Sequence, residues 1–347
     1  MSRRPSRRLQ PNNMQKTKVV ILNWNGEEHL RRFLPSVVRS VGEGVGVVVA
    51  DNGSTDGSIA WLEQHYPEVE LVRLDRNYGF AEGYNRALAR VEAEYLILLN
   101  SDVETPAGWI EPLVECLDRN PDVAACAPKL RGYEARESFE YAGASGGYID
   151  LLGYPFCRGR LLRSIEVDRG QYDDERDLFW VSGAAYCCRA SVFRALGGFD
   201  GDFFAHMEEI DLSWRMQLAG WRVRIVPQSV VYHLGGGTLQ TNSPRKVYLN
   251  HRNNLSMLYK CGTVGQLWLV ALVRPWLDLL AACSYLAQGQ GKAFCAVFRA
   301  WCDFFRQLGR LRAKRRAIER NASASQHIYR IPILLRYLFG ARKFTQL

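Results

Sequence analysis

Short apolar runs alternate with stretches of helical spacing through the first hundred residues. The apolar runs cover Lys18–Leu22, Gly46–Ala50, Glu70–Leu74 and Tyr95–Leu99. The spacing between them predicts helices over Glu27–Val41, Ser58–His65 and Phe80–Val91. Strands that alternate with helices in this way form βαβ units around a parallel sheet. The sequence therefore predicts an α/β fold with a mostly parallel central sheet flanked by helices.

Three of the apolar runs end in clusters of small polar residues, namely Asn23-Trp24-Asn25-Gly26, the segment Asp51–Gly57 and Asn100-Ser101-Asp102. Ligands of open α/β sheets bind beyond the carboxyl ends of the strands. Each cluster taken alone also suits a simple turn, because Asp, Asn, Gly and Ser are turn formers. As a site, Asp51 is placed to accept the imide N–H of a uracil or thymine ring, and Asp102 to ligate a hard divalent cation.

A second concentration of charge lies at Glu208, Glu209 and Asp211. Three carboxylates within four residues repel one another and raise local pKa values, which produces a general base usable near neutral pH. A solvated acidic face is the alternative, but the apolar residues between them argue against it. His233 ends a strand-like run, and Gly235–Thr238 follow it. A lone His is more often structural; together with Asp102 it becomes a second metal ligand, and the glycine run a mobile loop over phosphates.

Taken together and in order, these segments resemble the family 2 glycosyltransferases with a GT-A fold. The resemblance is greatest to the rhamnosyltransferase-like branch that makes O-antigen and other bacterial polysaccharides. It covers about residues 19–260, and its motifs are V-V-I-L-N-W-N-G (19–26), V-V-A-D-N-G-S-T-D-G (48–57), N-Y-G-F-A-E-G-Y-N (77–85), L-L-N-S-D-V (98–103), V-S-G-A (181–184), G-G-F-D (197–200), E-E-I-D-L-S-W-R (208–215) and H-L-G-G-G-T (233–238).

The resemblance implies a nucleotide-sugar site made of Asn23, Asn25, Asp51, Asn77, Gly79, Asn85, Asn100, Ser101, Asp102 and Gly183. It implies a Mg²⁺ or Mn²⁺ ion held by Asp102 and His233, with Asn100 where the family's metal motif has Asp. The pair Glu208-Glu209 stands where the family has Glu-Asp, whose second member is the catalytic base. Glu209 is therefore the expected base, and Glu208 and Asp211 remain alternatives.

The implied reaction is an inverting, single-displacement transfer from a dTDP- or UDP-linked sugar, with dTDP-rhamnose as one candidate donor. The implied acceptor is a glycan, or a glycan on a polyprenyl diphosphate, in cell-surface polysaccharide synthesis. Tyr248, Arg252 and Asn253 match a segment that follows the catalytic domain in this branch.

Charge divides the chain. Residues 245–347 carry 18 Lys and Arg but 3 Asp and Glu, whereas residues 19–244 are net acidic. We expect a basic, disordered N-terminus over 1–16, a catalytic domain over 17–243, and a basic, aromatic, helical region over 244–347. An acidic body with a basic tail suits an anionic surface.

The uncharged runs 261–273 and 279–291 are each shorter than the roughly 20 residues of a spanning helix, and Arg274, Pro275 and Asp278 separate them. We therefore expect the tail to lie on a membrane surface. A helical bundle packed on the catalytic domain is the alternative.

The N-terminal ten residues are basic without an apolar core, so we expect no secretory signal, and nine cysteines without a CxxC pair favour a reducing compartment. The expected location is the cytoplasm, peripheral on the inner face of the cytoplasmic membrane. A nucleotidyltransferase would carry a glycine-rich, basic phosphate loop where this chain has N-W-N-G-E-E. A nucleic-acid-binding role of the tail conflicts with the acidic body, so no nucleic-acid partner is expected. The sequence leaves the donor sugar and the oligomeric state open.

Overall fold

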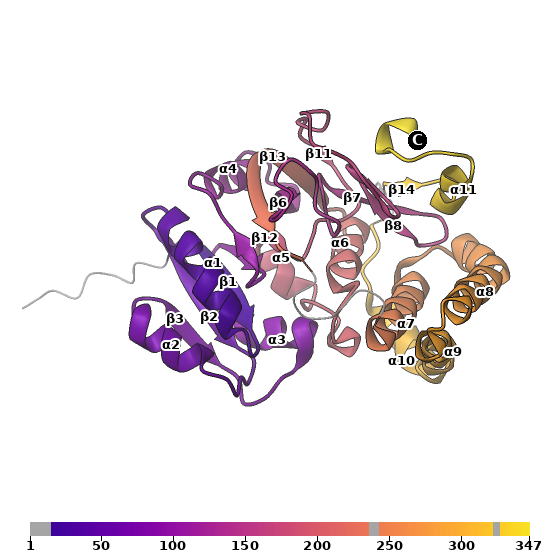
Figure 1. The fold of residues 1–347 in the computed structure, drawn as a ribbon, viewed down its shortest axis with the longest axis horizontal. Helices are drawn as coiled ribbons and strands as arrows, with labels where there is room; N and C mark the ends of the chain where they lie inside the picture. Colours follow the sequence, from indigo (N-terminus) through magenta and orange to yellow (C-terminus); the bar gives the residue numbers. More distant parts are fainter. Residues whose placement is uncertain (1–14, 236–242, 322–326) are drawn as a thin grey trace, which may run out of the picture.

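The computed structural model describes residues 15–235, 243–321 and 327–347 (Figure 1). Its main sheet has nine strands in the order β11-β13-β6-β12-β4-β1-β2-β3, and β5 pairs with β13. The strands are β1 (Thr17–Asn23), β2 (Val45–Asp51), β3 (Glu70–Arg73), β4 (Tyr95–Leu99), β5 (Val103–Glu104), β6 (Val123–Gly132), β11 (Arg176–Asp177), β12 (Ala185–Arg189) and β13 (Arg222–His233).

The strands β3, β2, β1 and β4 are mutually parallel. β12 runs antiparallel between β4 and β6, and β13 continues parallel to β6. The prediction of a mostly parallel central sheet is confirmed. The strand-like run that ends at His233 is part of the long strand β13, whose pairing with β6 is irregular between Val226 and Val230.

Helices cover both faces of this sheet. They are α1 (Glu27–Ser40), α2 (Ser58–His65), α3 (Gly79–Leu88), α4 (Glu111–Arg119), α5 (Ala190–Ala195) and α6 (Glu208–Leu218). Alternate residues of a strand point to opposite faces, and β1 shows this directly. Val20 packs in one apolar cluster with Tyr84 of α3, while Val19 and Ile21 pack in another with Leu30 of α1. Burial on both faces explains why the strands read as continuous apolar runs.

A second, smaller sheet lies beside the first. Its strands are β7 (Gly147–Asp150), β8 (Pro155–Cys157), β9 (Arg160–Leu161), β10 (Ser164–Ile165) and β14 (Ile328–Tyr329), in the order β10-β9-β8-β7-β14. Four of these short strands lie between residues 147 and 165, in a part of the sequence rich in Gly and Tyr. β14 was not predicted: the C-terminal region contributes a strand as well as helices.

The C-terminal helices are α7 (Pro244–Cys261), α8 (Val264–Ala287), α9 (Gly291–Arg306), α10 (Leu308–Ala317) and α11 (Ile333–Leu338). Most of the uncharged run 261–273 and the start of the run 279–291 belong to one helix, because α8 continues through Arg274, Pro275 and Asp278. Arg274 Nη1 donates to the Leu152 carbonyl and to Asn254 Oδ1, both at 2.7 Å. The protein, rather than solvent, satisfies this charge, so the helix need not end there.

The buried and exposed faces of α8 differ from those of a helix in a soluble protein, because polar side chains are buried and large apolar side chains are exposed. The buried residues recur at every fourth position and include polar side chains: Gln266, Val270, Arg274, Asp278 and Ala282. The positions two residues away are exposed and apolar, and are Val264, Trp268, Leu272, Trp276 and Leu280. Among the described residues, α8 alone is long and apolar enough to cross a membrane by length and composition.

Buried ion pairs join the C-terminal helices to the rest of the molecule. Lys260 of α7 contacts Asp200 and lies 2.7 Å from Asp211 of α6. Lys314 of α10 also contacts Asp200. Burial disfavours the charged carboxylate, but the two lysines outweigh it and hold the pKa of Asp200 far below its usual value. The predicted basic N-terminal segment lies almost wholly outside the described residues; Lys16, which is described, pairs with Asp118 at 2.8 Å.

Candidate active site

Strand register brings the predicted polar clusters to one edge of the main sheet. Asn23 at the end of β1 lies opposite Asp51 at the end of β2. Leu99 of β4 lies opposite Ile21, so Asn100, Ser101 and Asp102 follow at the same edge. His233 pairs with Val103 and thereby lies next to Asp102. The sequence placed these groups at strand ends, and the sheet makes them neighbours.

Asp102, His233 and Glu140 form a row of contacts. His233 Nε2 lies 3.1 Å from Asp102 Oδ1, and its Nδ1 lies 3.3 Å from Glu140 Oε1. Asn100 Nδ2 is 3.5 Å from His233 Nε2. Burial disfavours the imidazolium, but the hydrogen bond to Asp102 and the charge of Glu140 outweigh it and raise the pKa of His233 to about 10. Burial also opposes ionisation of Asp102, yet His233 holds the pKa of Asp102 below its usual value.

This row fits a divalent cation that takes most of its ligands from a substrate. Adjacent ligand atoms at metal–oxygen and metal–nitrogen distances of about 2.1 Å are separated by roughly the spacing seen between Asp102 and His233. Glu140, which the sequence analysis missed, stands behind the imidazole, where a carboxylate orients a metal-binding His. Within the described ranges, no group of three His, Cys, Asp or Glu side chains is arranged to hold a metal. Two protein ligands leave room for phosphate oxygens and water.

Asn23 and Asn25 use their amides to fix the loop after β2. Asn23 Nδ2 donates to Ser54 Oγ at 3.1 Å and Ser58 Oγ at 3.0 Å, while its buried Oδ1 has no hydrogen-bond partner. Asn25 Oδ1 accepts from the Thr55 N–H at 2.7 Å. Asn23 Oδ1 is thus a hydrogen-bond acceptor left unused at this edge.

Gly26 allows the backbone after β1 to lie close to the Asn23 and Ser101 side chains. A Cβ on Gly26 would lie 2.5 Å from Asn23 Oδ1 and 3.9 Å from Ser101 Oγ. Ser101 therefore lies beside the end of β1, where the sequence analysis expected it.

Asp51 and Asn77 lie on two loops that a third residue connects. Both carboxylate oxygens of Asp51 are 3.3 Å from the Ser54 N–H, and Asp51 is buried. Asn77 Oδ1 accepts from the Gly79 N–H at 2.8 Å and so shapes the turn into α3. Asn52, which was not predicted, donates to the Gly79 carbonyl at 2.9 Å and accepts from the Tyr78 N–H at 3.0 Å.

Asn85 does not join this edge. Its Oδ1 accepts from the Phe199 N–H and its Nδ2 donates to the Phe199 carbonyl, both at 2.9 Å. It lines a separate hollow beside Asp200, Lys260 and other residues of that region. In this structure the Asn85 amide fixes the loop before Asp200, and its expected nucleotide-binding role stays a prediction.

The carboxylates of α6 differ sharply in their surroundings. Glu209 Oε2 is buried without a hydrogen-bond partner, and so is Glu208 Oε2. Burial raises the pKa of Glu209 to about 7. Burial, reinforced by the charge of Glu209, raises the pKa of Glu208 well above its usual value. Ionisation of Glu208 is thus disfavoured by its burial and by its neighbour, whereas Glu209 titrates near neutral pH.

Asp211 is bound on both oxygens. Its Oδ2 accepts from Arg215 Nε at 2.8 Å, and its Oδ1 lies 2.7 Å from Lys260 Nζ. These two contacts anchor α6 to α7 through Asp211. Both carboxylate oxygens of Asp211 are thereby occupied by cations, unlike Oε2 of Glu209, so the geometry favours Glu209 over Asp211 as the expected base.

Gly183 connects Glu209 to the strand-end edge. A Cβ on Gly183 would lie 3.7 Å from Glu209 Cβ and 3.6 Å from the Phe80 ring. The next residue, Ala184, accepts a hydrogen bond from the Asn100 N–H at 3.0 Å through its carbonyl. Glu209 thus stands across Gly183 from the segment that carries Asn100 and Asp102.

The segment before α6 has an unusual backbone. Phe204, His206 and Met207 have φ values of 65°, 70° and 73°, in the left-handed region. Each such residue costs about 1–3 kcal/mol and persists only where its surroundings enforce it. Gly79 is part of these surroundings, since a Cβ there would lie 2.5 Å from the Phe204 ring.

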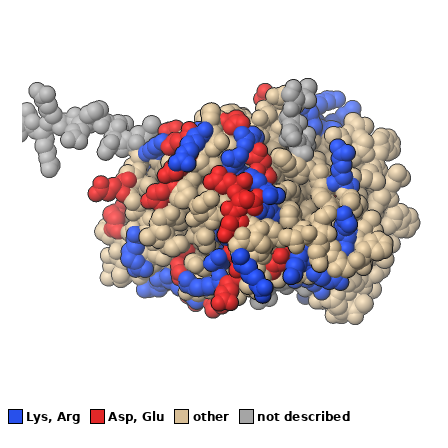
Figure 2. Space-filling model, turned by 90° about the horizontal axis from the view of Figure 1, so that it is seen from above, with Lys and Arg blue, Asp and Glu red and all other residues tan. Residues whose placement is uncertain are grey.

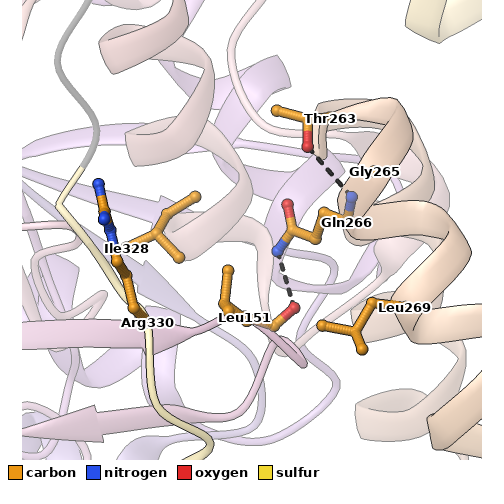
Figure 3. A pocket seen from close by; sticks show the side chains of 7 residues that line it. All are labelled: Leu151, Thr263, Gly265, Gln266, Leu269, Ile328 and Arg330. Carbon is orange, nitrogen blue, oxygen red and sulfur yellow. Dashed lines mark hydrogen bonds between the residues drawn. The ribbon is translucent and has the colours of Figure 1, made fainter.

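Other expected features lie elsewhere. Gly235 is described, with φ of 72°, but Gly236, Gly237 and Thr238 of the expected phosphate-covering loop lie outside the described residues. A hollow of about 370 Å³ lies between β14 and the start of α8, lined by Leu151, Thr263, Gly265, Gln266, Leu269, Ile328 and Arg330 (Figure 3). Gln266 Nε2 donates across it to the Leu151 carbonyl at 3.0 Å. None of the predicted site residues lines this hollow.

Comparison with known proteins identifies the family. The model of glycosyl transferase family 2 matches residues 18–168, and that of glycosyl transferase family group 2 matches residues 164–297. An N-acetylglucosaminyl-diphospho-decaprenol L-rhamnosyltransferase of Mycobacterium tuberculosis is 31% identical over 233 residues, which cover 62% of this chain and 75% of that protein. The chain belongs to glycosyltransferase family 2.

Two further relatives of this family 2 glycosyltransferase are more distant. A pre-mycofactocin glycosyltransferase of Mycobacterium tuberculosis is 27% identical over 279 residues, covering 76% of this chain and 54% of that protein. The O-antigen biosynthesis protein RfbC of Myxococcus xanthus is 30% identical over 190 residues, covering 54% of this chain and 14% of that protein.

Solved structures show the same fold. S. aureus TarS 1–349 in complex with UDP-GlcNAc matches with a TM-score of 0.57 at 16% identity, over 86% of this chain and 83% of that one. The structure of GalNAc-T7 with UDP, GalNAc and Mn²⁺ matches with a TM-score of 0.56 at 17% identity, over 72% of this chain and 48% of that chain. The family 2 glycosyltransferase described here therefore has the expected GT-A fold, and the expected resemblance to the rhamnosyltransferase-like branch is confirmed.

Proposed function

We propose that this enzyme transfers a sugar, with inversion, from a dTDP- or UDP-linked donor to a hydroxyl of a glycan carried on a polyprenyl diphosphate. The observation that carries the proposal is Glu209. Its Oε2 is buried without a hydrogen-bond partner, its pKa is about 7, and it stands across Gly183 from the segment that carries Asp102. The acceptor class follows the rhamnosyltransferase relative.

In the proposed reaction, the oxygen of the acceptor hydroxyl attacks the anomeric carbon while Glu209 takes the proton of that hydroxyl. The bond between that carbon and the nucleoside diphosphate breaks on the opposite face. Asp51 accepts the imide N–H of the pyrimidine, and Asn23 Oδ1 is a free acceptor beside it. Asp102 and His233, with Glu140 behind the imidazole, would hold a divalent cation such as Mg²⁺ or Mn²⁺, which supplies electrostatic stabilisation of the leaving diphosphate.

Nucleotide binding tests the donor side of this proposal. The full chain is expected to be stabilised by UDP or dTDP together with Mn²⁺, but not by ADP or GDP, in a thermal-shift assay. A ligand at 100 times its dissociation constant stabilises a protein by about 2.7 kcal/mol. An equal shift with ADP would contradict the assignment of Asp51, and no shift with any nucleotide would contradict the donor site as a whole.

We further propose that the enzyme works on the cytoplasmic face of a membrane and rests on it through the exposed face of α8. The side chains of Trp268, Leu272 and Trp276 are each 69% exposed. Leu338 and Phe339, at the end of α11, are 70% and 88% exposed. Large apolar side chains exposed along one face of a helix mark an interaction site, and Trp favours the lipid–water interface.

Charge supports the same surface. On the face shown in Figure 2, acidic and basic side chains are mixed over the part that carries the main sheet, while the end with the C-terminal helices shows basic side chains on a mostly uncharged surface. Lys and Arg near an anionic leaflet contribute about 1 kcal/mol each. α8 lies on the membrane in this proposal rather than crossing it, because Arg274 and Asp278 bind the protein on its other face.

The double variant Trp268→Glu with Trp276→Glu is expected to bind vesicles containing phosphatidylglycerol at least about 100-fold more weakly. Removal of two large apolar groups costs roughly 3 kcal/mol or more, and 1.4 kcal/mol is tenfold. Vesicle flotation of the full chain measures the effect. The matched Trp268→Phe with Trp276→Phe control should still float, and flotation of the Glu variant would contradict the docking face.

A further inference from the structure

Two side chains of α7 donate hydrogen bonds to the strained segment 202–207 that precedes α6. Asn253 is fully buried, and its Nδ2 lies 3.0 Å from the Phe203 carbonyl, 2.9 Å from that of Ala205 and 2.7 Å from that of His206. Its two N–H groups thus serve three carbonyl oxygens of the segment that leads into the carboxylate helix. No other described side chain donates to these three carbonyls except Arg252.

Arg252 is the second of these side chains. Its Nη2 donates to the Asp202 carbonyl at 2.8 Å and to the Phe203 carbonyl at 3.0 Å. Arg252 Nε and Nη2 also donate to Asn253 Oδ1, at 2.9 and 2.7 Å, so the guanidinium fixes the amide in the orientation that faces the segment. A guanidinium and an amide on successive residues therefore act as one unit.

The opposite side of the segment is held by α3. The Phe204 carbonyl accepts from the Phe80 N–H at 2.6 Å and from the Ala81 N–H at 3.2 Å. These are free N–H groups of a helix N-terminus. Every carbonyl from Asp202 to His206 is thereby hydrogen-bonded to α3 or α7, which compensates for the three left-handed residues.

We propose that Arg252 and Asn253 are positioning residues that hold the segment 202–207 in its left-handed course and so aim the Glu209 carboxylate at the acceptor hydroxyl. Relaxation of Phe204, His206 and Met207 would rotate the start of α6, where Glu209 is the second residue. The proposal rests on the proposed role of Glu209 as the base. It assigns to the C-terminal region a part in the reaction itself.

The test compares Asn253→Ala with wild type in the full chain. Displacement of a catalytic group by about 1 Å costs on the order of 100-fold in rate, so we expect kcat to fall by about 10- to 100-fold. The dissociation constant for UDP or dTDP with Mn²⁺ should stay within about twofold. The milder Arg252→Lys variant keeps the charge but has a single ammonium group in place of the guanidinium. We expect its kcat to lie between that of Arg252→Ala and that of wild type.

The pH profile separates positioning from a general loss of structure. Besides Glu208 on its own helix, the ionisable groups coupled to Glu209 are Cys157 of β8 and Tyr186 of β12, whose pKa values are raised mainly by burial and also by the charge of Glu209. A relaxed segment exposes Glu209 to water, so its pKa falls from about 7 toward the usual value for Glu. The acid limb of kcat should then move to lower pH by at least about half a unit.

Arg315→Ala is the matched control. Arg315 of α10 also donates to backbone carbonyls of α7 and its C-terminal end, at 2.6 Å to Tyr259 and 2.7 Å to Gly262, but it does not contact the segment 202–207. It should lower the melting temperature while leaving kcat and the acid limb unchanged.

Equal kcat and pH profiles in Asn253→Ala and Arg315→Ala would overturn the proposal. Glu209→Gln, measured in parallel, tests the base separately. Normal turnover of that variant, with a slow Asn253→Ala, would show that the segment acts through another group and would overturn the proposal as stated.

Discussion

The Glu209→Gln variant is expected to lose turnover by about 10²–10⁴-fold, the usual contribution of a positioned base, while it binds the nucleotide as tightly as wild type. Gln resembles the protonated form of Glu209. With a pKa of about 7, that form is already well populated at neutral pH, so the substitution should disturb the fold little. In wild type, turnover should fall as the pH drops below about 7, because the base becomes protonated.

Stability gives an independent readout of the same group. Burial raises the pKa of Glu209 in the folded protein above its value in the unfolded chain. As the pH rises past the unfolded pKa, Glu209 ionises more readily in the unfolded chain, and the free energy of unfolding falls until the pH passes the folded pKa. Above pH 7, Glu209→Gln should therefore melt at or above the temperature of wild type. A stabilised but slow enzyme is expected where a buried charge is retained for function.

Glu208→Gln is the control for this experiment. Glu208 lies beside Glu209 on the same helix turn, is buried, and has its pKa raised well above the usual value, so Gln replaces it with a neutral side chain of the same size. Its turnover should stay within a few-fold of wild type. A result in which Glu208→Gln is inactive and Glu209→Gln is active would transfer the base to Glu208.

The Asp102→Ala variant is expected to lose both metal-dependent nucleotide binding and turnover. Asp102 is the carboxylate proposed to hold the metal at the strand-end edge, and removal of one preorganised electrostatic group in an active site costs on the order of 10²–10³-fold in rate. Isothermal titration with UDP or dTDP, with and without Mn²⁺, should show that the metal no longer strengthens binding. This effect on binding distinguishes Asp102 from Glu209, whose loss should spare it.

Two variants frame the result for Asp102. Asp102→Asn keeps the shape but lacks the charge, and should be nearly as impaired as Ala. Asp118→Asn removes an Asp that pairs with Lys16 away from the strand-end edge, and it should behave as wild type. Full metal-dependent activity of Asp102→Ala would eliminate Asp102 as a ligand.

The sequence was sufficient for features encoded by local periodicity. Parallel strands produce polar residues at one edge, so Asn23, Asp51 and Asp102 were expected to meet, and the strand register agrees. The three carboxylates of α6 were expected to share one environment. Only the structure separates them, because the ion pairs of Asp211 come from Arg215 on its own helix and Lys260 in a distant segment.

What the sequence did not reveal depends on contacts between remote segments. Glu140 lies in a region without clear periodicity, and only the fold brings it to His233. The continuity of α8 was missed because Arg274 and Asp278 read as a charged break. Asn254 and Leu152, which satisfy Arg274, are 20 and 122 residues away. Prediction from local sequence treats charged residues such as Arg274 and Asp278 as solvent-exposed, whereas in α8 they lie on the buried face of the helix.

Three successive residues of α7 have consequences for preparing this enzyme. Arg252 and Asn253 hold the segment before the carboxylates, while the next residue, Asn254, accepts a hydrogen bond from Arg274 of α8 at 2.7 Å. Deletion of the C-terminal region to obtain a detergent-free protein would thus remove the support of the catalytic segment. Solubilisation by substitution of Trp268, Leu272 and Trp276 leaves these bonds intact, and is the better route to crystals and to kinetic assays.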